Sequence, residues 1–131
     1  MNKRFLNSLI ITITLLIFTI CSSAVAQEKN QMVRLAKLVI DSAQLDSYKS
    51  ALKEEIETSL HLEPGVITLY AISEKHNPTH ITIIEIYADE NAYKSHIQTP
   101  HFIKYKTGTK KMVVALELIE ATPIVPGIKI K

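Results

Sequence analysis

Four stretches of the chain carry the hydrophobic pattern of β-strands. They are rich in Val, Ile, Leu and Tyr, the residues that fit a pleated sheet, and they cover residues 32–40, 66–72, 80–87 and 114–125. In the first stretch both alternate sets of side chains include apolar residues. We therefore expect both faces of the predicted sheet to be covered at least in part.

A different spacing between the first two strands predicts an amphipathic helix over about residues 42–60. Its apolar stripe consists of Leu45, Tyr48, Leu52, Ile56 and Leu60. Asp41 is placed to cap this helix, and Gln44 three positions later to complete a capping box. Glu63-Pro64-Gly65 ends it, because proline fixes φ and glycine tolerates positive φ.

Two shorter helices are predicted between the third and fourth strands. Asp89 is a suitable N-cap for the first of them. Thr99 caps the second, with Pro100 at the first helical position, where the missing N–H costs nothing. The resulting order, β-α-β-β-α-β, predicts an α+β ferredoxin-like fold, with one antiparallel sheet and helices on one face.

The first 26 residues have the pattern of a signal peptide. Lys3 and Arg4 precede an apolar run from residue 5 to 20, and Ala24-Val25-Ala26 offers small residues at the two positions that signal peptidase reads. About 16 apolar residues span roughly 24 Å, short of a ~30 Å hydrocarbon core. We expect cleavage after Ala26 and an exported protein, periplasmic or secreted, that is not held in a membrane.

Cys21 allows a second interpretation of this segment as a lipoprotein signal, because such a signal also ends in a cysteine. The residue before it is Ile20, whereas the lipoprotein signal favours a small residue there. An uncleaved anchor is a third interpretation. Cleavage would remove the only cysteine of the chain, so the mature protein would contain neither a disulfide nor a reactive thiol.

Cleavage also changes the charge. The fifteen basic residues fall to thirteen, against thirteen acidic ones, and the formal charge of +2 becomes zero. A neutral chain lacks the basic surface that nucleic-acid binding needs. Residues 27–31 form a polar leader, 32–125 a single domain and 126–131 a C-terminal tail. A domain of this size buries about 65% of its unfolded surface, so association would help it.

Two histidines are candidate functional residues. Histidine is the natural general base near neutral pH, and His96 shares a predicted helix face with Ala92 and Tyr93. A structural histidine in the core is the competing interpretation. His101 lies in the first turn of the next helix, where the positive end of the helix dipole favours a neutral imidazole.

Glu85 interrupts an otherwise apolar strand. A covered carboxylate must be paired or protonated, and either state suggests a functional site. The alternative is a structural partner for Arg34 or Lys37 on a neighbouring strand. Tyr70 and Tyr87 could hydrogen-bond to an aromatic ligand or stack on its ring, although strand tyrosines often belong to the core.

No metal site is expected. His96 and His101 are five positions apart with a proline between them, so they do not share one helical face as i, i+4 ligands do. His76 and His80 lie on either side of a turn, and no carboxylate is spaced to complete a ligand set.

Three motifs carry a family resemblance: E-P-G-V, then E-I-Y-A-D-E-N-A-Y-K-S-H, then T-P-H-F. In this order they resemble the antibiotic biosynthesis monooxygenase family, including its quinol monooxygenase-like members, over about residues 32–124. The resemblance implies a dimeric α+β barrel that oxygenates electron-rich aromatics such as hydroquinones without metal, flavin or haem. His96 matches the family's A-Y-x-x-H histidine. The haem-degrading branch is disfavoured, since the chain has no Trp and Lys106 stands where its haem ligand would fall.

Together these observations predict a homodimer, sheet against sheet, whose cavity binds a small aromatic or quinol-like ligand. The predicted site comprises His96 and Glu85 as catalytic residues, with Tyr70, Tyr87, Arg34 and His101 binding the substrate. The expected reaction is cofactor-independent monooxygenation. The alternative is a protein that holds a small molecule in the same cavity without converting it.

Overall fold

The computed structural model describes residues 30–125, so the predicted signal peptide and C-terminal tail lie outside the described residues. The elements, in order, are β1 (Met32–Ile40), the 3-10 turn η1 (Ser42–Gln44), α2 (Leu45–Leu62), β2 (Val66–Ser73), β3 (His80–Tyr87), α3 (Glu90–His96), α4 (Pro100–Thr109) and β4 (Val113–Ala121). This order confirms the predicted ferredoxin-like α+β fold. None of the helices in this part of the chain is long and apolar enough to cross a membrane.

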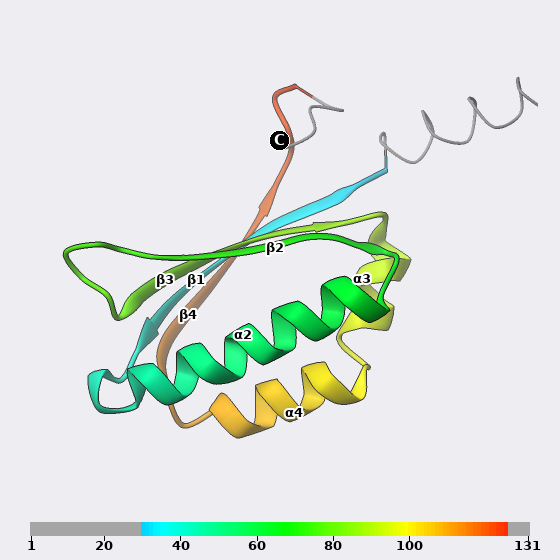
Figure 1. Ribbon diagram of the computed structural model, residues 1–131. Helices are drawn as coiled ribbons and strands as arrows, with labels where there is room; N and C mark the ends of the chain where they lie inside the picture. Colours follow the sequence, from blue (N-terminus) through cyan, green and yellow to red (C-terminus); the bar gives the residue numbers. More distant parts are fainter. Residues whose placement is uncertain (1–29, 126–131) are drawn as a thin grey trace, which may run out of the picture.

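The four strands form one antiparallel sheet in the order β2-β3-β1-β4. The central strand β1 places Arg34 opposite Glu85 of β3 on one side and Glu120 of β4 on the other. The described helices cover one face of this sheet, with α2 and α4 side by side and α3 at one end (Figure 1). Functional side chains on that face therefore lie under a helical layer.

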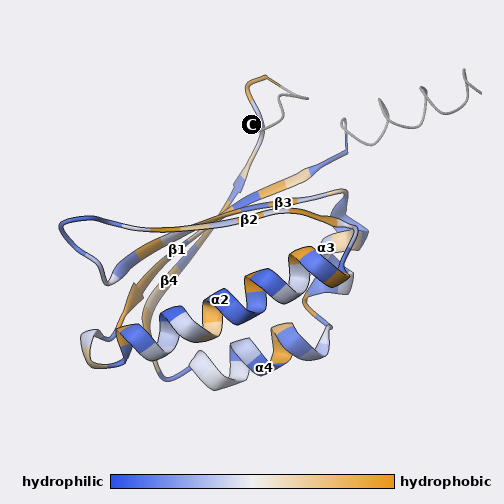
Figure 2. Cartoon of the chain, in the orientation of Figure 1, coloured by the Kyte–Doolittle hydropathy of each residue, from blue (hydrophilic) through white to orange (hydrophobic). Residues whose placement is uncertain are grey.

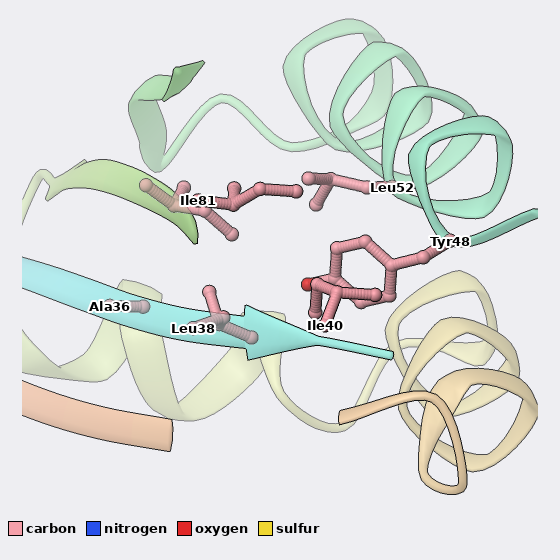
Figure 3. Packing of buried hydrophobic residues seen from close by; sticks show 7 residues of the cluster. Ala36, Leu38, Ile40, Tyr48, Leu52 and Ile81 are labelled. Carbon is pink, nitrogen blue, oxygen red and sulfur yellow. The ribbon is translucent and has the colours of Figure 1, made fainter. Parts of the chain in front are cut away.

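The main core lies between β1, β3 and α2. Alternate residues of β1 point toward the helices, as the sequence predicts, because successive strand side chains point to opposite faces. The buried cluster comprises Ala36, Leu38, Ile40, Tyr48, Leu52, Ile81 and Ile83 (Figure 3). Full burial of a large apolar side chain stabilises the fold by about 1.5–3 kcal/mol, so this cluster holds α2 on the sheet.

The opposite face of the sheet is apolar as well. Leu35 pairs with Ile84 of β3 and Ile119 of β4 on this face, and all three side chains are half-buried. Tyr70 of β2 lies beside Ile84 and is 60% exposed. Hydrophobic segments run along the strands in Figure 2, and none of the described helices lies over this face.

The buried face of α2 differs from the predicted stripe. Tyr48 and Leu52 are buried as expected, but Leu60 is 46% exposed while Glu55 and Ser59 are buried. A stripe spaced by four residues rotates by about 40° per step in a helix of 3.6 residues per turn. Leu60 has therefore turned away from the sheet, and the positions that follow the true helical period carry a carboxylate and a hydroxyl.

The caps of the two later helices agree with the sequence. Asp89 accepts a hydrogen bond from the Ala92 backbone N–H at 2.7 Å, and Thr99 accepts one from Phe102 at 3.3 Å. Asp41 caps the 3-10 turn that precedes α2. The last strand is shorter than predicted and ends at Ala121, just before Thr122-Pro123, because proline has no N–H to donate to a sheet.

Candidate active site

A cavity of about 320 Å³ lies between the helix-facing side of the sheet and the three helices. Four of the predicted site residues, Arg34, Glu85, Tyr87 and His96, line it together. Its apolar wall includes Leu52, Leu69, Ile83, Ile97, Phe102, Leu116 and Leu118. An apolar cavity of this size with a few convergent polar groups is typical of a small-molecule site.

His96 is the last residue of α3, and its side chain is only 2% exposed. Nδ1 lies 3.1 Å from Oε1 of Glu63, and Nε2 lies 3.6 Å from Oε1 of Glu55. The imidazole packs edge-on to Phe102, with ring centroids 4.9 Å apart, and lies 5.4 Å from the ring of Tyr87. Packing and hydrogen bonding thus fix its orientation from both sides.

Glu63 is ionised and determines which nitrogen of His96 carries the proton. Burial alone would raise the pKa of Glu63, but hydrogen bonds from His101 and His96 hold it below its usual value. A carboxylate only accepts hydrogen bonds, so the proton of a neutral His96 lies on Nδ1. Nε2 then presents its lone pair on the side of Glu55, which lines the cavity.

The chain reaches Glu63 through a tight turn. The Glu63 backbone N–H donates to the Ser59 carbonyl at 2.9 Å and ends α2. Two residues later, a Cβ on Gly65 would lie 2.6 Å from the Cβ of Ala92 on α3. Gly65 is not in the left-handed region, so close packing against α3, and not the predicted positive φ, requires glycine here. This contact keeps α3, and with it His96, against the turn.

Sequence reasoning missed Glu63 and Glu55 as site residues. The sequence pattern places Glu63 only at a helix end and does not predict that Glu55 lies on the buried face of α2. The Tyr48–Leu52–Glu55–Ser59 spacing is the signal that could have identified Glu55. Ser59 donates a hydrogen bond of 2.7 Å to Glu55, yet burial raises the pKa of this carboxyl.

Glu85 is the second carboxyl of the cavity. Burial raises its pKa, although the hydroxyl of Tyr87 and the charge of Arg34 lower it in part. The Tyr87 hydroxyl donates to Glu85 at 3.0 Å, and burial raises the pKa of Tyr87 so that it remains protonated. Glu85 therefore favours the neutral carboxylic acid more than an exposed glutamate does.

Arg34 brings a positive charge to the same cavity. Its guanidinium stacks over the ring of Tyr93 at 4.3 Å and lies 3.6 Å from the exposed carboxylate of Glu120. Within residues 30–125, Nε of Arg34 is the buried side-chain polar atom that has no hydrogen-bond partner. Arg34 pairs with Glu85 in the strand register, but its ion pair is with Glu120, and among the described residues Glu85 forms an ion pair with neither Arg34 nor Lys37.

The other two predicted binding residues do not line this cavity. Tyr70 points away from it and borders a separate hollow of about 340 Å³ between α2 and β2. His101 lies behind Glu63, with Nε2 2.6 Å from Oε1 of that carboxylate, and borders a smaller outer hollow of about 180 Å³. Tyr105 also lines the main cavity and has its hydroxyl 2.6 Å from that of Tyr48.

The two histidines and Glu63 also form a set of potential metal ligands. One donor atom from each of Glu63, His96 and His101 lies within 4.8 Å of the other two. His96 and His101 lie on different helices and share no helical face, as the sequence predicts, but Glu63 joins them. The chain turns between α3 and α4, with Thr99 as the new cap, so the two imidazoles reach the same carboxylate from different helices.

The model of the antibiotic biosynthesis monooxygenase family matches residues 32–108, from β1 into α4. This chain belongs to that family. No curated protein matches it. A general monooxygenase-like function agrees with this membership and with the solved relatives.

Solved structures of relatives support the family assignment. A candidate antibiotic biosynthesis monooxygenase from Bacteroides thetaiotaomicron is 62% identical, with a TM-score of 0.78, and the match covers 79% of this chain and 99% of that one. A candidate monooxygenase from Lactobacillus acidophilus is 32% identical, with a TM-score of 0.67 over 68% of this chain and 42% of that one. A third, from Nitrosomonas europaea, is 16% identical with a TM-score of 0.68 over 72% of this chain and 91% of that one, and shows the shared fold alone.

Proposed function

We propose that this family member is a cofactor-independent monooxygenase that oxidises a quinol or another electron-rich aromatic with molecular oxygen. The observation that carries the proposal is the orientation of His96. Glu63 accepts the proton on Nδ1 of a neutral His96, and the opposite nitrogen faces Glu55, which lines the cavity. A positioned base in an apolar cavity is what deprotonation of a phenol requires.

The chemistry begins with proton transfer from a substrate hydroxyl to Nε2 of His96. The resulting phenolate is a strong reductant and passes an electron to O2, and the two radicals then join to form a carbon–oxygen bond. The peroxide anion takes the proton back from His96, which regenerates the base. Loss of water from this peroxide leaves a carbonyl on the ring. One oxygen atom enters the product and the other leaves as water, while the substrate supplies all the electrons. The apolar wall excludes bulk water from these intermediates.

The remaining polar groups would position the substrate. Arg34 lines the cavity, and its positive guanidinium would bind a substrate oxygen and stabilise the phenolate. Glu85 in its neutral form can donate a hydrogen bond to a second oxygen of a quinol. Two oxygen-binding positions in one cavity favour a substrate with two ring oxygens, as in a hydroquinone or catechol.

The test is oxygen uptake by purified protein, stripped of metal and flavin, with a panel of hydroquinones and catechols. Heat-denatured protein corrects for autoxidation of the substrates. Saturable uptake above that control supports the enzyme. Absence of uptake across the panel, with saturable binding of the same compounds, would favour the alternative, a binding protein that uses the same cavity.

The protein is further proposed to act as an exported homodimer. The apolar face formed by Leu35, Ile84 and their neighbours has no helical cover among the described elements, and a second copy would bury it by two-fold symmetry. The family resemblance supports the same arrangement. Export rests on the signal-peptide pattern of residues 1–26.

A further inference from the structure

The residues behind His96 form a cluster that the proposed oxygenation does not fully use. Glu63 lies between two imidazoles, 3.1 Å from Nδ1 of His96 and 2.6 Å from Nε2 of His101. The three side chains come from the turn after α2, the end of α3 and the first turn of α4. Only His96 of the three also lines the main cavity.

We propose that Glu63, His96 and His101 form a binding site for a divalent transition metal of the zinc class. Two imidazole nitrogens and one carboxylate oxygen are the donors that such ions prefer, and three protein ligands with one open position is a common arrangement. Tetrahedral zinc holds its ligand atoms roughly 3.3 Å apart, since each bond is about 2.0–2.1 Å. The three donor atoms already lie within 4.8 Å of one another.

The charges around the cluster also suit a cation. Two neutral imidazoles and one carboxylate sum to a single negative charge, and Glu55, whose Oε1 is 3.6 Å from Nε2 of His96, lies on the far side of the ring. Lys104, the basic residue on the neighbouring turn of α4, is paired with Glu54. A bound ion would take the place of the hydrogen-bonded protons between the three side chains.

An entry route exists on the outer side of the helical layer. The side chains of His101 and Glu63 are 17% and 13% exposed, whereas His96 is almost fully buried. His101 also borders the outer hollow of about 180 Å³ between α2 and α4. A metal ion can therefore reach the cluster without passing through the substrate cavity.

Metal binding would change the state of His96. An ion on Nδ1 replaces the proton there, so a neutral imidazole must carry its proton on Nε2, toward Glu55 and the cavity. If the proposed function holds, such a histidine donates a hydrogen bond and no longer accepts the substrate's proton. The metal would then act as an inhibitor and not as a catalytic cofactor. The metal site itself does not depend on the proposed function.

The test is calorimetric titration of tag-free purified protein with zinc chloride in a buffer that does not bind metals. We expect one ion per chain, with binding weakened at least about tenfold in both His101→Ala and Glu63→Gln, because removing a direct ligand costs at least as much as removing a supporting residue. His76→Ala, which removes an exposed histidine from the hairpin, is the matched control and should bind as the native protein does.

A second readout follows the imidazole directly. In nitrogen-15 NMR, zinc should shift the Nδ1 resonance of His96 and the Nε2 resonance of His101, at the same metal-to-protein ratio as the heat signal. Absence of one-site binding at millimolar zinc would overturn the proposal. Equal affinity in the native protein and both ligand variants would do so as well, because zinc would then bind elsewhere. Neither outcome bears on oxygen uptake by metal-free protein.

Discussion

Nδ1 of the buried His96 lies 3.1 Å from a carboxylate oxygen of Glu63, a residue 33 positions earlier in the chain. This contact joins the end of α3 to the turn that ends α2. It fixes the tautomer of a neutral His96 through the ionised state of Glu63, and it leaves the other ring nitrogen on the side of Glu55, which lines the cavity. A site residue and its orienting partner thus come from separate parts of the fold.

Glu63→Gln should therefore destabilise the protein at neutral pH. Hydrogen bonds to a charged group contribute about 1.5–3 kcal/mol, and glutamine replaces these charge-assisted bonds with weaker neutral ones. Because the pKa of Glu63 is lowered in the folded state, its contribution is present above the unfolded value of about 4.3 and is lost as the pH falls through the folded pKa. Urea unfolding at pH 7 and pH 3 measures the difference in unfolding free energy between the native protein and the variant. An equal difference at both pH values would contradict the prediction.

Glu85→Gln should have the opposite effect. Burial raises the pKa of Glu85, so the folded protein holds this proton more tightly than the unfolded chain does. The ionised carboxylate of Glu85 therefore begins to destabilise the fold as the pH rises above about 4.3, and this effect is complete above the folded pKa. Glutamine resembles the neutral acid and still accepts from Tyr87. Thermal unfolding should show equal stability near pH 4 and a variant that becomes increasingly more stable toward pH 8. A pH-independent difference would argue against a buried, raised-pKa carboxyl.

His96→Gln should abolish most of the oxygen uptake. Glutamine fills much of the same space between Phe102 and Tyr87, so the fold is expected to persist, while the general base is lost. General-base catalysis contributes typically about 10²–10⁴-fold, and the rate should fall by that factor. His76→Gln in the exposed hairpin is the control. Uptake at the native rate, with circular dichroism showing a folded variant, would remove His96 from the mechanism.

Leu35→Glu tests the proposed dimer. Leu35 lies on the apolar sheet face between Ile84 and Ile119, so a charge there should prevent a second copy from packing. Sedimentation velocity should show a dimer for the native protein and a monomer for this variant. Ile103→Glu, at a 49% exposed position on α4, should remain a dimer. A native protein that is monomeric at micromolar concentration would rule out the sheet-against-sheet arrangement.

Expression of the full chain in a bacterium tests the predicted export. Intact-mass measurement should show a product that begins at Gln27, and Ala24→Arg should block this processing. The processed product of Cys21→Ser should have the same mass as that of the native chain, because the cysteine is removed with the signal peptide. A lipid-sized mass lost in Cys21→Ser would instead identify a lipoprotein.

The sequence by itself determined the order of strands and helices, the caps Asp89 and Thr99, and the alternation of side chains between the two faces of β1. These features depend on interactions between residues a few positions apart, so periodicity and capping patterns report them directly. His96 and Glu85 were found for a related reason. A polar residue at a position that the local period assigns to the interior is visible in the sequence.

Only the tertiary structure decided which side chains meet. Glu63 contacts His96 and His101 across 33 and 38 positions, and no local pattern encodes the angle at which α4 restarts after Thr99. Tyr70 is the opposite case, a residue predicted for the site that does not reach the cavity. Its residue type suited a binding site, but the bulge at the start of β2 and the pleat of the strand place it on the other face of the sheet. Packing between helices and strands fixes these distances, so only the tertiary structure brings the site residues together.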